Sequence, residues 1–230
     1  MTADSTPDQA LERLLAGVHR FQRDVYPQRR TIYQQLMREG QHPHTLFITC
    51  ADSRIGPELL TQSDPGDIFV LRNIGNLVPP YGEMMGGVSA VIEYAVAALQ
   101  VNQIVICGHS DCGAMKGLLS DQSVASMPAV KNWLRNAEAA LSVVRTRSKT
   151  VDENVRLEEL IGQNVLLQMN HALTHPAVAA GVAAGTLAVS GWVYDIADGD
   201  VQIYNQSKKE FIALSEAEQE PSAAVYTSGQ

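Results

Sequence analysis

Two short motifs hold the residue types in this sequence that are best suited to chemistry. The first contains Cys50, Asp52 and Arg54, and the second contains His109 and Cys112. Thiolate and imidazole groups are the ligands that zinc favours in proteins. Three protein ligands leave one coordination position open for water, which is typical of a catalytic zinc site rather than a structural one. The two cysteines and the histidine therefore predict a zinc site with a hydrolytic or hydration role.

The first motif also supplies a carboxylate and a guanidinium at a spacing that allows them to pair. Asp52 and Arg54 are two residues apart, so both side chains can lie on one side of an extended segment. As a fourth metal ligand the carboxylate would close the site, whereas as an acceptor it would bind zinc-bound hydroxide. A bidentate grip by Arg54 would hold Asp52 away from the metal and keep it ionised. We therefore expect an Asp52–Arg54 dyad, with a closed structural zinc site as the alternative.

The charge of this ligand set bears on the pH at which the site works. Two thiolates would neutralise the double positive charge of the zinc ion. Water bound there should be less acidic than at an all-histidine zinc site, where its pKa is about 7. We therefore expect the activity to favour alkaline pH.

Strands must bring the two motifs together. Short apolar runs at residues 46–50, 68–71 and 104–107 have the length and the β-branched content of buried strands. Apolar residues recur at helical spacing over residues 88–99, which predicts the crossover helix that parallel strands require. Open parallel sheets bind ligands beyond the carboxyl ends of their strands, where both motifs lie. The pattern therefore predicts a parallel sheet with the site at its edge.

Predicted helices and strands also make up the rest of the chain. Helical spacing predicts four further helices, at residues 8–22, 27–39, 128–146 and 152–174. Residues 187–195 and 201–204 are predicted to form two strands joined by a turn.

These elements predict an α/β fold, with a mainly parallel central sheet flanked by helices, an N-terminal helical arm and a C-terminal strand hairpin. We expect a single domain over residues 1–230, in which residues 1–40 form the arm and residues 215–230 form a frayed tail.

Composition excludes several classes of protein. The chain of 230 residues has 17 Lys and Arg against 25 Asp and Glu, a net charge of −8 that argues against nucleic-acid binding. No apolar stretch reaches the ~20 residues needed to cross a bilayer, and the acidic N-terminus lacks the pattern of a secretory signal. Three cysteines are too few for a disulfide framework. We expect no membrane partner and a cytoplasmic location, with a bacterial microcompartment or an organelle as the alternative.

Further segments complete a pattern that resembles a known family. Between the motifs, Phe69 begins a Phe-Val-Leu-Arg-Asn segment, and Gly-Trp-Val-Tyr-Asp stands at residues 191–195. Together with Cys-x-Asp-x-Arg and His-x-x-Cys-Gly, they resemble the β-class carbonic anhydrases over residues 8–205. The resemblance is closest to the plant-type branch and to the bacterial enzymes that accompany cyanase, on segments such as residues 45–50, 65–73, 92–99 and 127–134.

The resemblance implies an activity and a ligand set. The activity is the zinc-dependent reversible hydration of CO2 to bicarbonate and a proton by zinc-bound hydroxide. The resemblance implies one zinc ion per chain on Cys50, His109 and Cys112, beside the Asp52–Arg54 dyad.

It further implies a CO2 pocket and a partner chain. The residues implied to line the pocket are Gln41, Phe69, Ile74, Tyr94 and the Gly113 backbone N–H. In the family the site lies at a dimer interface under the N-terminal helices, so a homodimer or a higher even oligomer is expected. One branch of the family also binds bicarbonate at a second position, using a Trp three residues before the first Cys. Phe47 stands there in this chain, so the resemblance does not support bicarbonate inhibition of that kind.

The sequence is also compatible with other functions. Hydrolases of carbonyl sulfide or carbon disulfide share this fold and these ligands. A non-catalytic zinc-thiol module that acts as a scaffold or a redox sensor is a second alternative. A structural or shell-associated partner of a CO2-fixing or cyanate-degrading system is a third.

Simpler interpretations apply to several residues near the second motif. Cys107 lies in an apolar run and is expected to be a small buried hydrophobic residue. Asp111 is a candidate helix cap. Gly108 and Gly113 have the spacing of a phosphate-binding loop, but Ala114 stands where that loop needs Lys, which argues against nucleotide binding.

Overall fold

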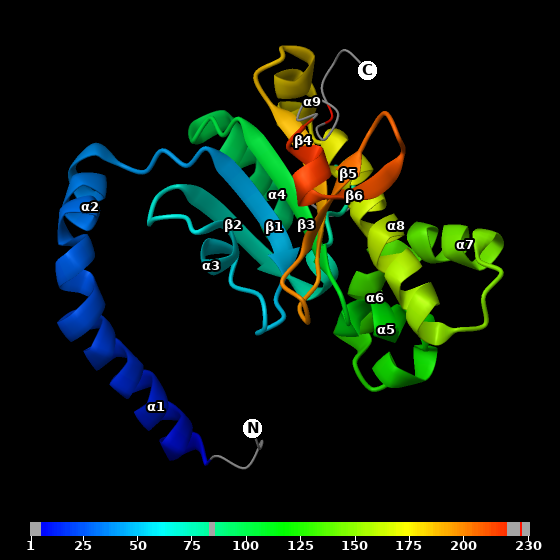
Figure 1. Ribbon diagram of the computed structural model, residues 1–230, viewed down its shortest axis with the longest axis horizontal. Helices are drawn as coiled ribbons and strands as arrows, with labels where there is room; N and C mark the ends of the chain where they lie inside the picture. Colours follow the sequence, from blue (N-terminus) through cyan, green and yellow to red (C-terminus); the bar gives the residue numbers. More distant parts are fainter. Residues whose placement is uncertain (1–5, 83–85, 220–225, 227–230) are drawn as a thin grey trace. The chain divides into compact units, whose positions relative to one another are not determined.

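The chain divides into two units, Met1–Gln41 and His42–Gln230. A six-stranded sheet forms the centre of the larger unit, His42–Gln230. The computed structural model describes residues 6–82, 86–219 and 226. The strands are β1 (Thr45–Cys50), β2 (Ile68–Asn73), β3 (Gln103–His109), β4 (Ala188–Tyr194), β5 (Val201–Asn205) and β6 (Glu210–Ala213). Their order is β2-β1-β3-β4-β5-β6 (Figure 1).

The first four strands are parallel, and the last two are antiparallel additions at one edge. The β1–β3 register pairs Thr49 with Cys107, and the β3–β4 register pairs His109 with Tyr194. The carboxyl ends of β1 and β3 therefore meet at one edge of the sheet. The α/β fold, with its parallel sheet and C-terminal hairpin, is confirmed.

Helices follow the strands along the chain and cover the sheet. They are α3 (Pro57–Thr61), α4 (Gly87–Glu93), α5 (Gly113–Leu119), α6 (Pro128–Leu134), α7 (Glu138–Arg147), α8 (Glu153–Leu173), α9 (Pro176–Ala183) and α10 (Leu214–Ala217). The longest, α8, packs against β3 and β4, and it also contacts α5 and α7 (Figure 1). No helix within the described ranges is long and apolar enough to cross a membrane.

Close approach of α8 to the sheet depends on a glycine in β4. A Cβ at Gly191 would lie 2.6 Å from the Met169 sulfur and 2.7 Å from Val165 Cγ1, both on α8. Buried residues of β1 and β3, including Leu46 and Ile106, pack into the same core cluster as these two α8 side chains. The core therefore fixes α8 firmly behind the strands that carry the site.

The N-terminal unit consists of helical segments in sequence. These are α1 (Pro7–Arg20), a π-helical turn (Phe21–Val25) and α2 (Tyr26–Glu39). Thr6 and Gln9 form a capping box at the start of α1, which satisfies backbone N–H groups that would otherwise lack partners. The apolar side chains of α1 are at least half exposed, namely Leu11, Leu14, Leu15 and Val18. The two predicted helices of the arm are thus confirmed, joined by a turn that remains helical.

One prediction about the helices is wrong. Residues 128–146 do not form one helix, because α6 and α7 are separated by a 3-10 turn at Arg135–Ala137. The side-chain amide of Asn136 donates to the Trp133 carbonyl at 2.8 Å, in competition with regular helical hydrogen bonds. The sequence analysis also missed α9, which is short and apolar on all sides, and the four-residue strand β6.

Residues 215–230, expected to be a frayed tail, lie partly outside the described residues. Of the part described, α10 includes Ala217, which is buried beside Ile203 and Ile212, and Tyr226 forms an isolated bridge with Val189.

Candidate metal centre

Three potential metal ligands meet where β1 and β3 end. Cys50 is the last residue of β1, His109 is the last residue of β3, and Cys112 precedes α5. Their ligand atoms, two sulfurs and one imidazole nitrogen, lie within 4.8 Å of one another, and all three residues are buried. Parallel pairing of β1 with β3 thus brings together motifs that are almost 60 residues apart in the sequence.

The imidazole of His109 is oriented so that one ring nitrogen can act as a metal ligand. Its Nδ1 lies 2.8 Å from the Ser110 carbonyl oxygen, and a carbonyl can only accept, so Nδ1 carries the proton of the neutral ring. The other nitrogen, Nε2, therefore presents a lone pair. It is buried and has no hydrogen-bond partner within the part of the chain that the structure describes. An orphaned buried acceptor facing two thiols fits zinc, and zinc ligation would satisfy it.

The two thiols influence each other before any metal binds. A hydrogen bond from Cys112 lowers the pKa of Cys50, and proximity to Cys50 together with burial raises the pKa of Cys112. A metal ion displaces the protons of both thiols, because thiolates are the ligating form. Cys50 is therefore the thiol of this pair that loses its proton first.

The Asp52–Arg54 pair that the sequence predicts is present. Arg54 donates from Nε to Asp52 Oδ1 at 2.9 Å and from Nη2 to Asp52 Oδ2 at 2.7 Å. The backbone N–H of Arg54 also donates to Oδ1 at 2.9 Å. The hydrogen bond from Arg54 holds the pKa of the Asp52 carboxyl well below its usual range. Asp52 Oδ2 lies 4.0 Å from His109 Nε2, so an ionised carboxylate stands beside the ligand set.

A second carboxylate grips Arg54 from the other side. Arg54 Nη1 donates to Asp111 Oδ2 at 2.8 Å, and Lys116 pairs with the same carboxylate. The candidate role of Asp111 as a helix cap is not found, since the N-cap of α5 is Cys112 and that helix start has no side-chain cap. Its backbone φ of 59° turns the loop so that the carboxylate faces Arg54. Sequence reasoning missed this contact, and no spacing rule signals it.

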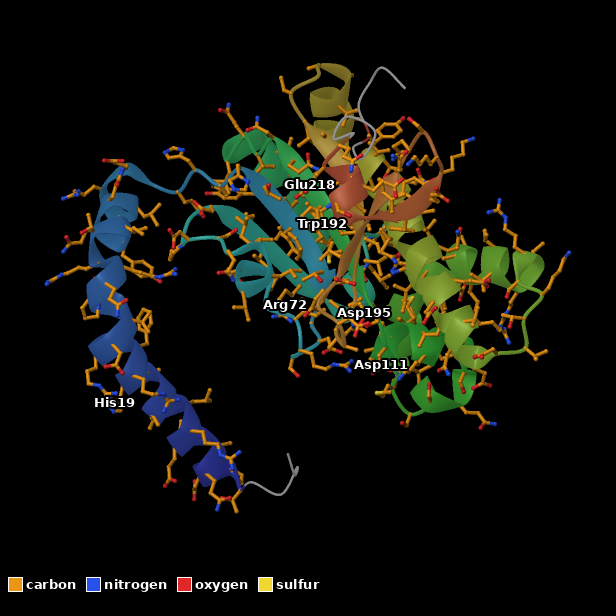
Figure 2. All side chains as sticks on the ribbon, in the orientation of Figure 1. His19, Arg72, Asp111, Trp192, Asp195 and Glu218 are labelled. Atoms are coloured by element: carbon orange, nitrogen blue, oxygen red, sulfur yellow. The ribbon has the colours of Figure 1, made fainter. Side chains whose placement is uncertain are left out.

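Arg72 is another residue that the sequence analysis did not place in the site. From β2 its Nε donates to the Cys50 carbonyl at 3.1 Å, and its Nη2 donates to the Asp52 carbonyl at 2.5 Å. Figure 2 shows Arg72 and Asp111 at the same end of the sheet. A charged residue in an otherwise apolar strand was the available signal. Arg72 fixes the backbone that carries both a ligand and the dyad carboxylate.

Four of the five expected pocket residues belong to the larger unit. The rings of Phe69 and Tyr94 lie 6.1 Å apart between centroids. Ile74 follows β2 directly and is partly exposed, and Gly113 is the first residue of α5. Gln41 belongs to the N-terminal unit.

Cys107 is not part of the site. It is fully buried in β3, and burial raises the pKa of its thiol to about 12. Its predicted role as a small buried hydrophobic residue is confirmed.

Comparison with known proteins agrees with this geometry. Residues 45–201 match the protein family described as Carbonic anhydrase. The carbonic anhydrase of Pseudomonas aeruginosa is 46% identical over 203 residues, which cover 88% of this chain and 91% of that protein.

Solved structures are similar as well. The β-carbonic anhydrase CcaA superposes with a TM-score of 0.86 at 41% identity, covering 89% of this chain and 92% of that one. One of two tetrameric β-carbonic anhydrases from the filamentous ascomycete Sordaria macrospora has a TM-score of 0.74 at 30% identity, covering 84% and 96%. With its Cys-His-Cys zinc site at the end of a parallel sheet, the chain belongs to the β-class carbonic anhydrases, the enzymes that hydrate CO2.

Proposed function

We propose that this chain hydrates CO2 reversibly with Asp52 and Arg54 as the catalytic dyad and Cys50, His109 and Cys112 as the zinc ligands. The observation that carries the proposal is the position of the Asp52 carboxylate, 4.0 Å from His109 Nε2 and gripped by Arg54. Zinc bound at this site would supply a Lewis acid that lowers the pKa of water and makes it nucleophilic.

The chain's own residues then have separate roles. Asp52 stays ionised, because Arg54 holds it, and it accepts a hydrogen bond from the attacking water and orients that water toward CO2. Arg54 also keeps the carboxylate from turning onto the metal as a fourth ligand. We expect the activity to favour alkaline pH, since two thiolates neutralise the charge of the zinc ion.

The substrate pocket is proposed to involve Gln41, Phe69, Ile74, Tyr94 and the Gly113 backbone N–H. The contact between the Phe69 and Tyr94 rings supports an apolar wall suited to CO2. The first-turn N–H of α5 at Gly113 lacks a helical partner and would donate a hydrogen bond to an oxygen of bicarbonate.

The proposed assembly is a homodimer or a higher even oligomer. Tyr94 is about half exposed and Ile74 is 42% exposed in the single chain, as expected for a pocket completed by a partner. The exposed leucines of α1 would pack in such an assembly, and the Sordaria macrospora relatives are described as tetrameric.

Three finer predictions accompany this proposal. We propose membership of the plant-type branch near the cyanase-associated bacterial enzymes, supported by the sequence segments noted above and by Gln41, which stands nine residues before Cys50 as in the plant-type pattern. A single domain over residues 1–230 is also proposed. We keep a cytoplasmic location as a prediction, supported by three free cysteines.

Stopped-flow assays with CO2 and with carbonyl sulfide test the proposed function. We expect rapid hydration of CO2 and little hydrolysis of carbonyl sulfide. Hydrolysis of carbonyl sulfide without CO2 hydration would assign the chain to the hydrolases that share this fold. Full zinc content with neither activity would favour a scaffold.

A further inference from the structure

Residues 74–78, which follow β2, are anchored by side chains from two helices. Trp133 of α6 donates from Nε1 to the Ile74 carbonyl at 2.8 Å. Asn164 of α8 donates from Nδ2 to the Gly75 carbonyl at 3.1 Å, and Gln168 Oε1 accepts from the Val78 N–H at 2.8 Å. Three side chains thus hold the backbone on both sides of Gly75.

The two α8 anchors are unusual residues for their position. Asn164 is 1% exposed and Gln168 is fully buried, one helical turn apart on the same helix face. Gln168 Nε2 donates to Asn164 Oδ1 at 2.9 Å and to the Asn136 carbonyl at 3.1 Å. Buried amides are costly unless they are bonded, so this satisfied network defines one arrangement of the backbone that it touches.

The anchored segment contacts a metal ligand directly. The Gly75 N–H donates to Cys50 Sγ, with 3.4 Å between nitrogen and sulfur. Gly75 has a φ of 78°, and a Cβ there would lie 3.0 Å from Ala114 Cβ and 3.3 Å from Met115 Cε. Only glycine therefore fits where the backbone presents this N–H group beside the start of α5.

We propose that Asn164, Gln168 and Trp133 are positioning residues for the metal centre, holding the Gly75 N–H on the sulfur of Cys50. A hydrogen bond to a thiolate stabilises its lone-pair electrons and so reduces its electron donation to a bound metal. The three side chains touch neither the ligands nor the dyad through any described hydrogen bond. They set the electronic character of one ligand through the backbone.

The inference rests on the zinc centre of the proposed function, and cobalt-substituted protein tests it independently of turnover. Loss of the hydrogen bond raises the energy of the sulfur lone pairs, so the sulfur-to-cobalt charge-transfer band should move to longer wavelength. The variants are Asn164→Leu, Gln168→Leu and the gentler Trp133→Phe, which keeps an aromatic ring and serves if the first two fail to fold.

The matched control is Asn205→Leu. Asn205 is also fully buried, and its Oδ1 accepts from the Lys208 N–H at 2.8 Å, but it lies in β5. We expect the band of the control to coincide with that of the wild type, and the three anchor variants to shift together in the same direction.

Two results would overturn the inference. Bands that stay unchanged in the anchor variants, although cobalt binds fully, would show that the network only stabilises the fold. An equal shift in Asn205→Leu would show a general effect of lost stability. The proposed function has a separate test, because it would be wrong if wild-type protein with a full complement of zinc did not hydrate CO2.

Discussion

Arg54 binds the Asp52 carboxylate with two nearly equal hydrogen bonds, 2.9 Å from Nε to Oδ1 and 2.7 Å from Nη2 to Oδ2. Its remaining nitrogen, Nη1, binds Asp111. The guanidinium therefore joins one carboxylate beside the metal ligands to another on the loop before α5. This arrangement fixes the direction in which Asp52 can act.

Substitution of Arg54 by Ala should reduce turnover while zinc stays bound. Asp52 loses both hydrogen bonds from the guanidinium and keeps only the one from the backbone N–H of residue 54, so its carboxylate becomes free to turn onto the metal. The loss should be about 100-fold, as for a misplaced catalytic group. Stopped-flow CO2 hydration and metal analysis of the same sample measure both effects. The control is Arg145→Ala, at an exposed position on α7. A variant that keeps near wild-type turnover would remove Arg54 from the mechanism.

Asp111→Asn should have a smaller effect. The Asp111 side chain is 53% exposed, and an exposed ion pair contributes no more than about 1 kcal/mol, or roughly fivefold. The difference from wild type should shrink as salt is added, because salt screens exposed charges. Hydration rates at low and high ionic strength measure it. A loss as large as that of Arg54→Ala, unaffected by salt, would contradict this account.

The sequence predicted the ligands and the dyad because their geometry is local or follows from parallel strands. Cys50 and His109 each end a strand, and Asp52 and Arg54 are two residues apart. The contacts of Asp111 and Arg72 depend on how loops from distant strands meet, which spacing does not encode. The polar anchors Asn164 and Gln168 were likewise missed, because an amide on an amphipathic helix normally indicates its solvent-exposed face. The break between α6 and α7 was missed because the sequence spacing does not show the hydrogen bond that the Asn136 side chain makes there to the Trp133 carbonyl.

His175 should make the protein less stable as pH falls. Its side chain is buried, and Nε2 lies 3.1 Å from the Pro79 carbonyl oxygen. Burial lowers the pKa of the imidazole in the folded state, whereas the unfolded chain titrates at about 6.5. Below that value the unfolded chain binds more protons than the folded protein, so the free energy of unfolding decreases with falling pH.

Urea denaturation between pH 7 and pH 5 measures this effect. His175→Gln removes the titrating group, so the variant should lose less stability over this interval than the wild type. His19→Gln, at an exposed position of α1, is the control and should follow the wild type. Identical pH dependence in all three proteins would exclude His175 as the cause.

Removal of residues 1–25 should lower both the oligomeric state and the activity. The truncation deletes α1, whose leucines are exposed in the single chain and would pack in an oligomer. Obligate interfaces bury about 2,000–5,000 Å², so the separated chain should also be less stable. Light scattering and CO2 hydration of the same sample measure the two effects. A fully active monomer of 24.9 kDa, or a truncated chain that stays oligomeric and active, would contradict the shared-site proposal.

Zinc titration of metal-free protein tests the central claim most directly. Zinc would be added stepwise to wild-type protein and to Cys112→Ser, with CO2 hydration measured by stopped flow at each step. In the wild type the rate should rise linearly and stop rising at one zinc ion per chain, while Cys112→Ser should stay inactive, because a hydroxyl ionises far less readily than a thiol. A rate that does not depend on zinc, or a Cys112→Ser variant that binds zinc and turns over like the wild type, would contradict the account.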